Sequence, residues 1–147
     1  MTVILGADHA GFSLKEKLKQ ALTDADFVVV DAGAKTLDKN DDYPDYAIKV
    51  ANRVGNGQGN YGILVCGSGA GVCIAANKIK NIRAVAVTTA AEAKLTREHN
   101  DANVLCLSGW NLSLGTAKKI VLTWLKTPFS GEARHARRIK KIADLEN

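Results

Sequence analysis

Residues 66–71, Cys-Gly-Ser-Gly-Ala-Gly, are the part of this sequence best suited to bind an anion. The three alternating glycines permit a tight turn and a close approach of a ligand to backbone N–H groups. Where such a turn opens a helix, its N–H groups face the ligand and the helix dipole favours negative charge. The Gly-Lys-Ser/Thr ending of a Walker loop is missing, and a plain connecting turn is the alternative interpretation.

Cys66 stands at the start of this turn. A thiol close to the N-terminus of a helix is more readily ionised than a free thiol, which would make it reactive. The alternative interpretation is a small buried hydrophobic residue. Cys73 and Cys106 are predicted to be core residues of that kind.

Three further groups of polar residues could take part in chemistry. Asp8 and His9 follow an apolar segment, and His99 ends a predicted helix. Arg134 and Arg138 are four residues apart and therefore share a helix face, and an arginine pair suits a phosphate dianion. The alternatives are a structural Asp-His pair, a histidine that interacts with the helix dipole, and a solvated basic face.

Short apolar segments alternate with longer amphipathic segments, which predicts an α/β fold. Because the helices alternate with the strands, we expect a three-layer, doubly wound, five-stranded parallel sheet of the Rossmann or flavodoxin-like type, with strand order 2-1-3-4-5. In that order the chain reverses between strands 1 and 3, where a ligand crevice opens beside residues 8–11 and 66–71. The predicted strands are residues 3–7, 27–31, 62–66, 83–87 and 103–107, and the predicted helices are residues 12–23, 44–54, 70–80, 90–99, 114–126 and about 132–145.

Composition narrows the class of protein. The chain has 147 residues, of which 46% are hydrophobic and 24% charged, which predicts one globular domain over residues 1–147. No apolar run approaches a membrane span, and the first residues do not resemble a secretory signal. Three cysteines without zinc spacing fit reduced thiols in the cytoplasm. The net charge of +5 comes from the second half of the chain, which suggests an anionic ligand but not nucleic acid.

Six segments resemble, in order, the ribose-5-phosphate isomerase B family, whose wider group includes galactose- and allose-phosphate isomerases. The resemblance runs from about residue 3 to residue 142. It implies an enzyme of the pentose phosphate pathway that interconverts ribose 5-phosphate and ribulose 5-phosphate, needs no cofactor or metal, and forms a homodimer or a tetramer. It also implies active sites at the subunit interface, reached by the C-terminal helix of the partner. The segments are residues 6–11, 42–47, 66–71, 75–78, 97–105 and 131–135.

The resemblance also implies a role for individual residues. Cys66 matches the base that moves a proton between carbons 1 and 2 through an enediolate, whereas another branch of the family uses a Glu at the position of Val72. His99 matches the residue that opens the sugar ring, with Asp8 assisting. Ser68, a further catalytic candidate, belongs with its neighbours to an anion hole. The other matched substrate contacts are Gly67, Gly69, Ala70, Gly71, His9, Tyr43 and Asn100, together with Arg134 and Arg138 from the partner subunit.

The residues leave other functions open. Trp110 stands where the family usually has a phosphate-gripping Arg, and it could shape the pocket for allose-6-, galactose-6- or a tetrose phosphate. A non-catalytic phosphate- or nucleotide-binding module could use the same crevice, although strand 3 ends in Cys66 and not in an acidic phosphoacceptor. A thiol-redox protein is disfavoured because no C-x-x-C is present. Nucleic-acid binding by residues 134–141 would show a strong salt dependence.

Overall fold

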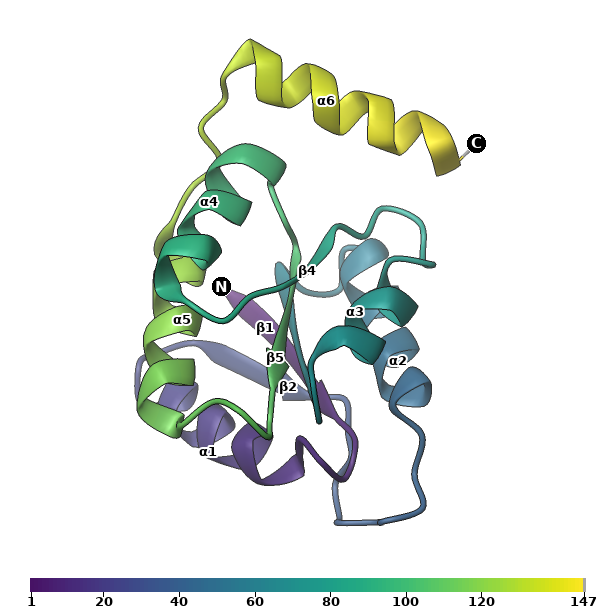
Figure 1. The fold of residues 1–147 in the computed structure, drawn as a ribbon, viewed down its shortest axis with the longest axis vertical. Coiled ribbons are helices and arrows are strands. Elements are labelled where there is room, and N and C mark those ends of the chain that lie inside the picture. The colour runs from purple at the N-terminus through teal and green to yellow at the C-terminus, as the bar shows by residue number, and fades with distance from the viewer. Residues whose placement is uncertain (147) are drawn as a thin grey trace.

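A parallel sheet with helices on both faces forms the body of the computed structural model, which describes residues 1–146 (Figure 1). Helices α1, α4 and α5 cover one face, and α2 and α3 cover the other. None of the described helices is long and apolar enough to cross a membrane. The elements are β1 (Thr2–Ala7), α1 (Phe12–Thr23), β2 (Val28–Asp31), α2 (Tyr43–Gly55), β3 (Tyr61–Cys66), α3 (Ala70–Ala76), β4 (Ala84–Ala86), α4 (Ala90–Asn100), β5 (Val104–Ser108), α5 (Leu114–Lys126), α6 (Ala133–Ala143) and a 3-10 turn, η1 (Asp144–Glu146).

The doubly wound parallel sheet is confirmed, but the predicted order of its last two strands is wrong. The observed order is β2-β1-β3-β5-β4, and β5 pairs with β3 from Gly62 opposite Val104 to Cys66 opposite Ser108. All of β5 is buried, as an internal strand requires, whereas the three-residue β4 becomes progressively exposed and occupies one edge. The four-residue β2 forms the other edge. The reversal between β1 and β3 is unaffected.

Helix α3 is shorter than predicted and ends at Ala76 instead of near residue 80. The side chain of Asn77, the first residue after the helix, is hydrogen-bonded to the start of the next strand, which favours a turn at this position over another turn of helix. Its Nδ2 donates to the carbonyl oxygen of Ala84 at 2.9 Å, and its Oδ1 accepts from the Ala84 N–H at 2.8 Å. These two bonds tie the end of α3 to the first residue of β4, across the turn at residues 77–83.

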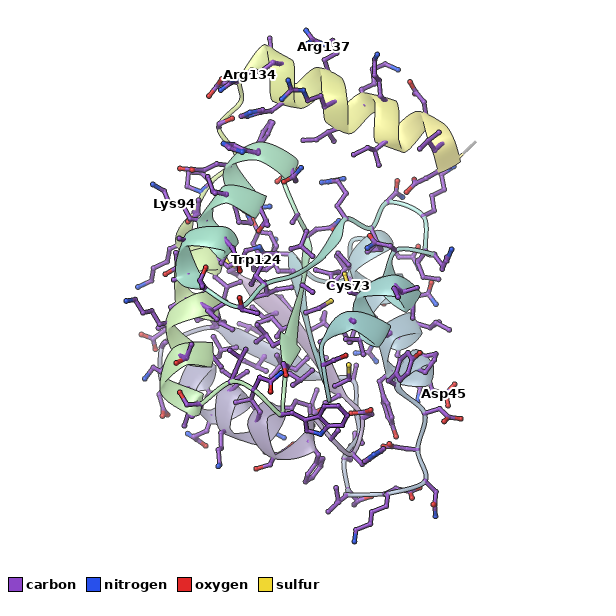
Figure 2. All side chains as sticks on the ribbon, viewed as in Figure 1. Asp45, Cys73, Lys94, Trp124, Arg134 and Arg137 are labelled. Carbon is purple, nitrogen blue, oxygen red and sulfur yellow. The ribbon has the colours of Figure 1, made fainter. Side chains whose placement is uncertain are left out.

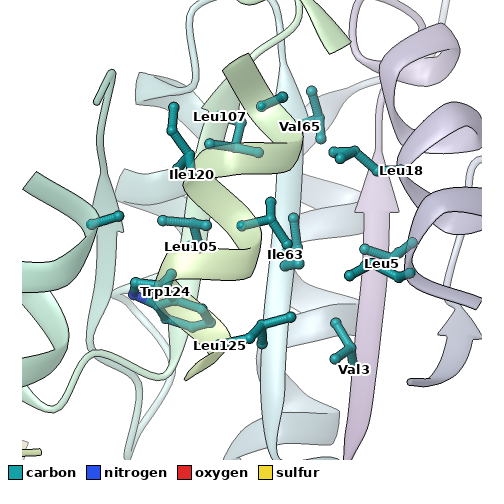
Figure 3. Packing of buried hydrophobic residues seen from close by; sticks show 14 of the residues in the cluster. Val3, Leu5, Leu18, Ile63, Val65, Leu105, Leu107, Ile120, Trp124 and Leu125 are labelled. Carbon is teal, nitrogen blue, oxygen red and sulfur yellow. The ribbon is translucent and has the colours of Figure 1, made fainter. Parts of the chain in front are cut away.

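The sheet separates two hydrophobic cores because successive strand residues point to opposite faces. Figure 3 shows the larger core, in which Ile120, Trp124 and Leu125 of α5 pack against the strands. The smaller core contains Cys66 and Cys106, under α2 and α3. The internal strands are thus held on both faces, and they provide a rigid support for the loops at their carboxyl ends.

Arg97 of α4 is a charged residue inside this framework, only 4% exposed. Its Nη1 donates to Asp101 Oδ1 at 2.7 Å and to the carbonyl oxygen of Ala102 at 2.6 Å, and its Nη2 donates to the Tyr61 hydroxyl at 2.8 Å. The guanidinium also lies 4.7 Å from the ring centre of Tyr61 and 5.7 Å from that of Trp124. These contacts fix the last turn of α4, which carries His99 and Asn100, onto the sheet.

Replacing Arg97 by Met should lower the free energy of unfolding by about 2–4 kcal/mol, because Ala102 and Tyr61 lose buried hydrogen-bond partners. Urea denaturation followed by circular dichroism measures this loss. Arg137→Met, on the exposed side of α6, is the matched control and should change stability by less than about 0.5 kcal/mol. Equal losses in the two variants would show that Arg97 has no special structural role.

Helix α6 lies beyond α4, at the end of the molecule away from α1 (Figure 1). Its buried residue His135 packs against His99, with ring centres 4.3 Å apart and the two rings tilted by 40°. Nδ1 of His135 lies 2.9 Å from Ser130 Oγ. At the other end, the Glu146 carboxylate accepts from the N–H of Asn81 at 3.0 Å. Arg134 and Arg137 project outward from the helix (Figure 2).

Candidate active site

The loops after β1 and β3 enclose a pocket of about 350 Å³ at the point where the chain reverses. The structure therefore brings together the two polar, glycine-containing turns that the sequence places at neighbouring strand ends. The lining residues are Asp8, His9, Ala10, Tyr43, Cys66, Gly67, Ser68, Gly71 and Trp110.

The turn after β3 fixes the thiol of Cys66 at one wall of the pocket. Cys66 is buried, and its Sγ accepts a hydrogen bond from the N–H of Gly69 at 3.2 Å. Gly69 has a φ of +82°, a left-handed conformation that glycine adopts without strain. The N–H of Ala70 donates to Ser68 Oγ at 3.2 Å. Gly69 and Ala70 thus use these N–H groups inside the turn, and Gly67, Ser68 and Gly71 face the pocket.

The turn after β1 forms another wall and carries Asp8 and His9. Asp8 is buried, and its Oδ1 accepts from the N–H of Gly11 at 3.1 Å. Asp41, from the loop before α2, accepts two hydrogen bonds from His9 through the same oxygen, Oδ1. The donors are the backbone N–H at 2.9 Å and the ring Nδ1 at 2.7 Å.

This pairing affects both ionisable groups. The hydrogen bond to Asp41 raises the pKa of His9 above its ordinary value, against the smaller opposing effect of burial. Burial is the largest single influence and would raise the pKa of Asp41, but the hydrogen bonds from His9, together with the Tyr46 hydroxyl, hold that pKa below its ordinary value. The ligand atoms of Asp8, His9 and Asp41 lie within 4.8 Å of one another. Both carboxylates accept hydrogen bonds from protein N–H groups, and these bonds hold the cluster together.

Two aromatic rings cover glycines at the rim of the pocket. A Cβ atom on Gly71 would lie 2.6 Å from Cζ of Tyr43, and one on Gly67 would lie 2.5 Å from Cζ2 of Trp110. Glycine at both positions therefore lets the rings pack directly on the backbone. Trp110 is 74% exposed, although its backbone N–H donates to the carbonyl oxygen of Gly67 at 3.2 Å.

Six candidate residues do not line this pocket: Gly69 and Ala70 lie within its glycine turn, and His99, Asn100, Arg134 and Arg138 lie away from it in the same chain. His99 and Asn100 end α4, which leads into the amino end of β5, whereas the pocket is at the carboxyl ends of the parallel strands. A strand of five or six residues spans roughly 17–20 Å, and this length separates the amino ends of the strands from their carboxyl ends. Arg134 and Arg138 belong to α6, at the same distant end (Figure 2).

The sequence matches the model of the Ribose/Galactose Isomerase family over residues 3–142. The chain belongs to this family. The matched range coincides with that of the six resembling segments, and the family resemblance is confirmed.

Members of the family from several bacteria cover nearly the whole chain. A probable ribose-5-phosphate isomerase B of Mycoplasma genitalium is 45% identical over 145 residues, which is 98% of this chain and 95% of the relative. The ribose-5-phosphate isomerase B of Escherichia coli is 40% identical over 144 residues, which is 98% of this chain and 95% of the relative.

Solved structures of the family agree with the fold. The Clostridium thermocellum ribose-5-phosphate isomerase B has a TM-score of 0.96 at 42% identity, with 99% of this chain and 97% of that chain covered. The Mycoplasma genitalium protein, solved with bound ribulose-5-phosphate, has a TM-score of 0.94 at 44% identity, with 99% and 95% covered.

The pocket also contains contributions that sequence reasoning missed. Ala10 lines it, and Asp41 lies behind His9, in a loop with no recognisable pattern. Only its position in the sequence could have indicated Asp41, because it directly precedes the segment 42–47 that resembles the family. Pairing of Asp41 with His9 depends on a contact between residues 32 positions apart.

Proposed function

We propose that this chain interconverts ribose 5-phosphate and ribulose 5-phosphate in the cytoplasm, as a step of the pentose phosphate pathway, without a metal or organic cofactor. One observation carries the proposal. In a chain of the Ribose/Galactose Isomerase family, Cys66 and three residues of the turn after it, Gly67, Ser68 and Gly71, line one pocket with Asp8 and His9 at the switch point of the sheet. The family member solved with ribulose-5-phosphate supports this choice of substrate.

The proposed chemistry is a proton transfer between adjacent carbon atoms. Cys66, as the thiolate, takes the proton from carbon 2 of the open-chain aldose, and the electron pair forms the enediolate double bond between carbons 1 and 2. The thiol returns the proton to carbon 1, and the proton of the carbon 2 hydroxyl passes to the carbon 1 oxygen, which leaves the carbon 2 carbonyl of the ketose. Gly67, Ser68 and Gly71 line the pocket beside Cys66, where N–H and hydroxyl groups can stabilise the enediolate oxygens.

The phosphate group provides binding energy away from the reacting carbons. In this proposal His9 binds it at the wall opposite Cys66, and Tyr43 contacts the sugar at the rim. Asp8 assists His99 in opening the sugar ring, a proton transfer to which a histidine is suited near neutral pH. His99 lies at the amino ends of the strands in its own subunit, away from the pocket, so in this proposal it acts on the pocket of another subunit.

We propose accordingly a homodimer in which each subunit completes the pocket of the other. His99, Asn100, Arg134 and Arg138 would enter the partner's pocket together, since they occupy one end of the molecule. The single domain over residues 1–147 would extend its C-terminal helix, about 132–145, to the partner; Asn147 lies outside the described residues. The exposed arginines of α6 support this arrangement (Figure 2), and a tetramer would be a pair of such dimers.

A substrate panel tests the proposed activity. The purified protein, treated with EDTA, is assayed for ketose formation from ribose-5-, allose-6-, galactose-6- and tetrose phosphates. We expect turnover of ribose 5-phosphate well above that of the other sugars. Preference for another sugar would contradict the substrate assignment and make Trp110 the first residue to mutate, while no turnover across the panel would favour a phosphate-binding module.

A further inference from the structure

We propose that Asp41 is a positioning residue for phosphate recognition, because it holds His9 as an imidazolium whose Nε2–H serves the phosphate of the substrate. The inference rests on the proposed function, in which His9 contacts that phosphate. Asp41 itself touches no substrate: it lies behind His9 and is not among the residues that line the pocket.

The geometry of the pair fixes the imidazole ring. Asp41 Oδ1 accepts from the backbone N–H of His9 at 2.9 Å and from its ring Nδ1 at 2.7 Å. Two bonds from one residue to one oxygen restrict the side-chain rotation of His9 and occupy Nδ1. The other ring nitrogen, Nε2, is then the one left for a ligand in the pocket that His9 lines.

The proposed role requires a shielded carboxylate and an accessible ring, and the exposures of Asp41 and His9 differ in this way. The Asp41 side chain is 6% exposed, whereas that of His9 is 38% exposed. The carboxylate is therefore shielded from water, which strengthens its interaction with the ring, while the ring remains open to the pocket. The separation of 2.7 Å between Nδ1 and Oδ1 is typical of a charge-assisted hydrogen bond.

The charges around His9 favour the protonated ring. The hydrogen bond to Asp41 is the largest influence that raises the pKa of His9, burial opposes it, and the charges of Asp8, Asp41 and Asp38 add to it. Cys66 and Tyr43 line the same pocket. In the proposed dimer, Arg134 and Arg138 of the partner subunit would also approach the phosphate. Their positive charges would lower the pKa of His9 and so oppose its protonation.

Tyr46 completes the surroundings of the Asp41 carboxylate. Its hydroxyl interacts with the Asp41 side chain and lowers the pKa of Asp41. Burial, and then the interaction with Asp41, raise the pKa of Tyr46. The Tyr46 hydroxyl therefore keeps its proton and helps to keep Asp41 charged, as the pairing with a protonated His9 ring requires.

The substitution Asp41→Asn tests the inference, because it keeps the size of the side chain and an acceptor oxygen but removes the charge. NMR of the imidazole protons measures the pKa of His9, and His9→Gln assigns its signal among the three histidines of the chain. We expect a wild-type pKa above the ordinary 6.5 and a value at or below 6.5 in the variant. Asp38→Asn is the matched control, since Asp38 adds charge from the same loop without bonding the ring.

Kinetics provide the functional readout. At pH 7.5 the Asp41→Asn variant should show a KM for ribose 5-phosphate raised about tenfold, with kcat changed less than about twofold, because a charge-assisted contact to the phosphate is lost. At pH 5.5 the KM values of variant and wild type should converge, since His9 is protonated in both. A structural role of Asp41 would not produce this convergence.

Several results would overturn the inference: a wild-type His9 pKa at or below 6.5, an unchanged pKa in Asp41→Asn, or a lowered pKa with an unchanged KM. If Asp41→Asn does not fold, inorganic phosphate is titrated into the wild type instead. It should raise the pKa of His9 further, and no change would overturn the inference. Absence of isomerase turnover in the wild type would refute the proposed function, whereas the pKa of His9 in the wild type and in Asp41→Asn, each measured with and without phosphate, would still decide the role of Asp41.

Discussion

Replacing Cys66 by Ala should lower kcat for ribose 5-phosphate by roughly 10²–10⁴-fold, because the variant has no group to take the proton from carbon 2. The phosphate-binding wall formed by the turn after β1 is unchanged by the substitution, so inorganic phosphate should bind as tightly as before. Removal of one sulfur from the edge of the smaller core should leave the fold intact. Steady-state kinetics, competition with phosphate and circular dichroism measure the three expected results.

Cys73 provides the matched control for this experiment. A hydrogen bond with Cys106 lowers the pKa of Cys73 to about 7, so by ionisation it is a competing candidate for the base. It does not line the pocket, however, and it lies within α3, two residues beyond the glycine turn. Cys73→Ala should therefore retain turnover within about twofold of the wild type. Near-normal turnover of Cys66→Ala, or its loss in Cys73→Ala, would show that Cys66 is not the base.

Mixing two inactive variants should restore activity if each pocket is built from two subunits. A dimer of one Cys66→Ala subunit and one His99→Gln subunit has one pocket with both substitutions and one pocket with neither. Random reassociation gives mixed dimers in about half of the population, so the mixture should recover about a quarter of the wild-type kcat. The two variants are co-refolded from urea and assayed with ribose 5-phosphate.

The pair Cys66→Ala and Ser68→Ala is the control for subunit mixing. Both residues line the same pocket of the same chain, and every pocket of their mixed dimer therefore carries one substitution. This mixture should show no recovery beyond the activities of its parents. If the mixture of Cys66→Ala with His99→Gln also shows none, although both variants refold and form dimers, the pocket is not shared and His99 has another role.

The sequence predicted the fold well where local pattern decides the structure. The β-branched runs of the strands and the amphipathic helices were recognisable, because burial on one or two faces of an element sets the spacing of apolar residues along the sequence. The order of β4 and β5 was not recognisable. Residues 83–87 look as apolar as residues 103–107, and only tertiary packing shows that the second segment is internal.

The candidate site divides in the same way. The turns at residues 8–11 and 66–71 could be predicted to meet, because they follow strands on either side of the chain reversal. The burial of Arg97 could not, since an arginine within a helix normally faces water. The separation of His99 from the pocket could also be predicted, because a crossover helix of a parallel sheet ends at the amino end of the next strand, whereas the pocket is at the carboxyl ends.

The two edge strands restrict the ways in which copies of this chain can associate. β2 has four residues and β4 has three, which offers a neighbouring chain very little backbone to pair with. Asp31 at the end of β2 forms ion pairs with Lys15 and Lys19, each at 2.8 Å, which places charge beside that edge. Growth of the sheet from molecule to molecule is therefore disfavoured. Association through helices and loops remains, and contacts of this kind can close into a small symmetric assembly instead of an open filament.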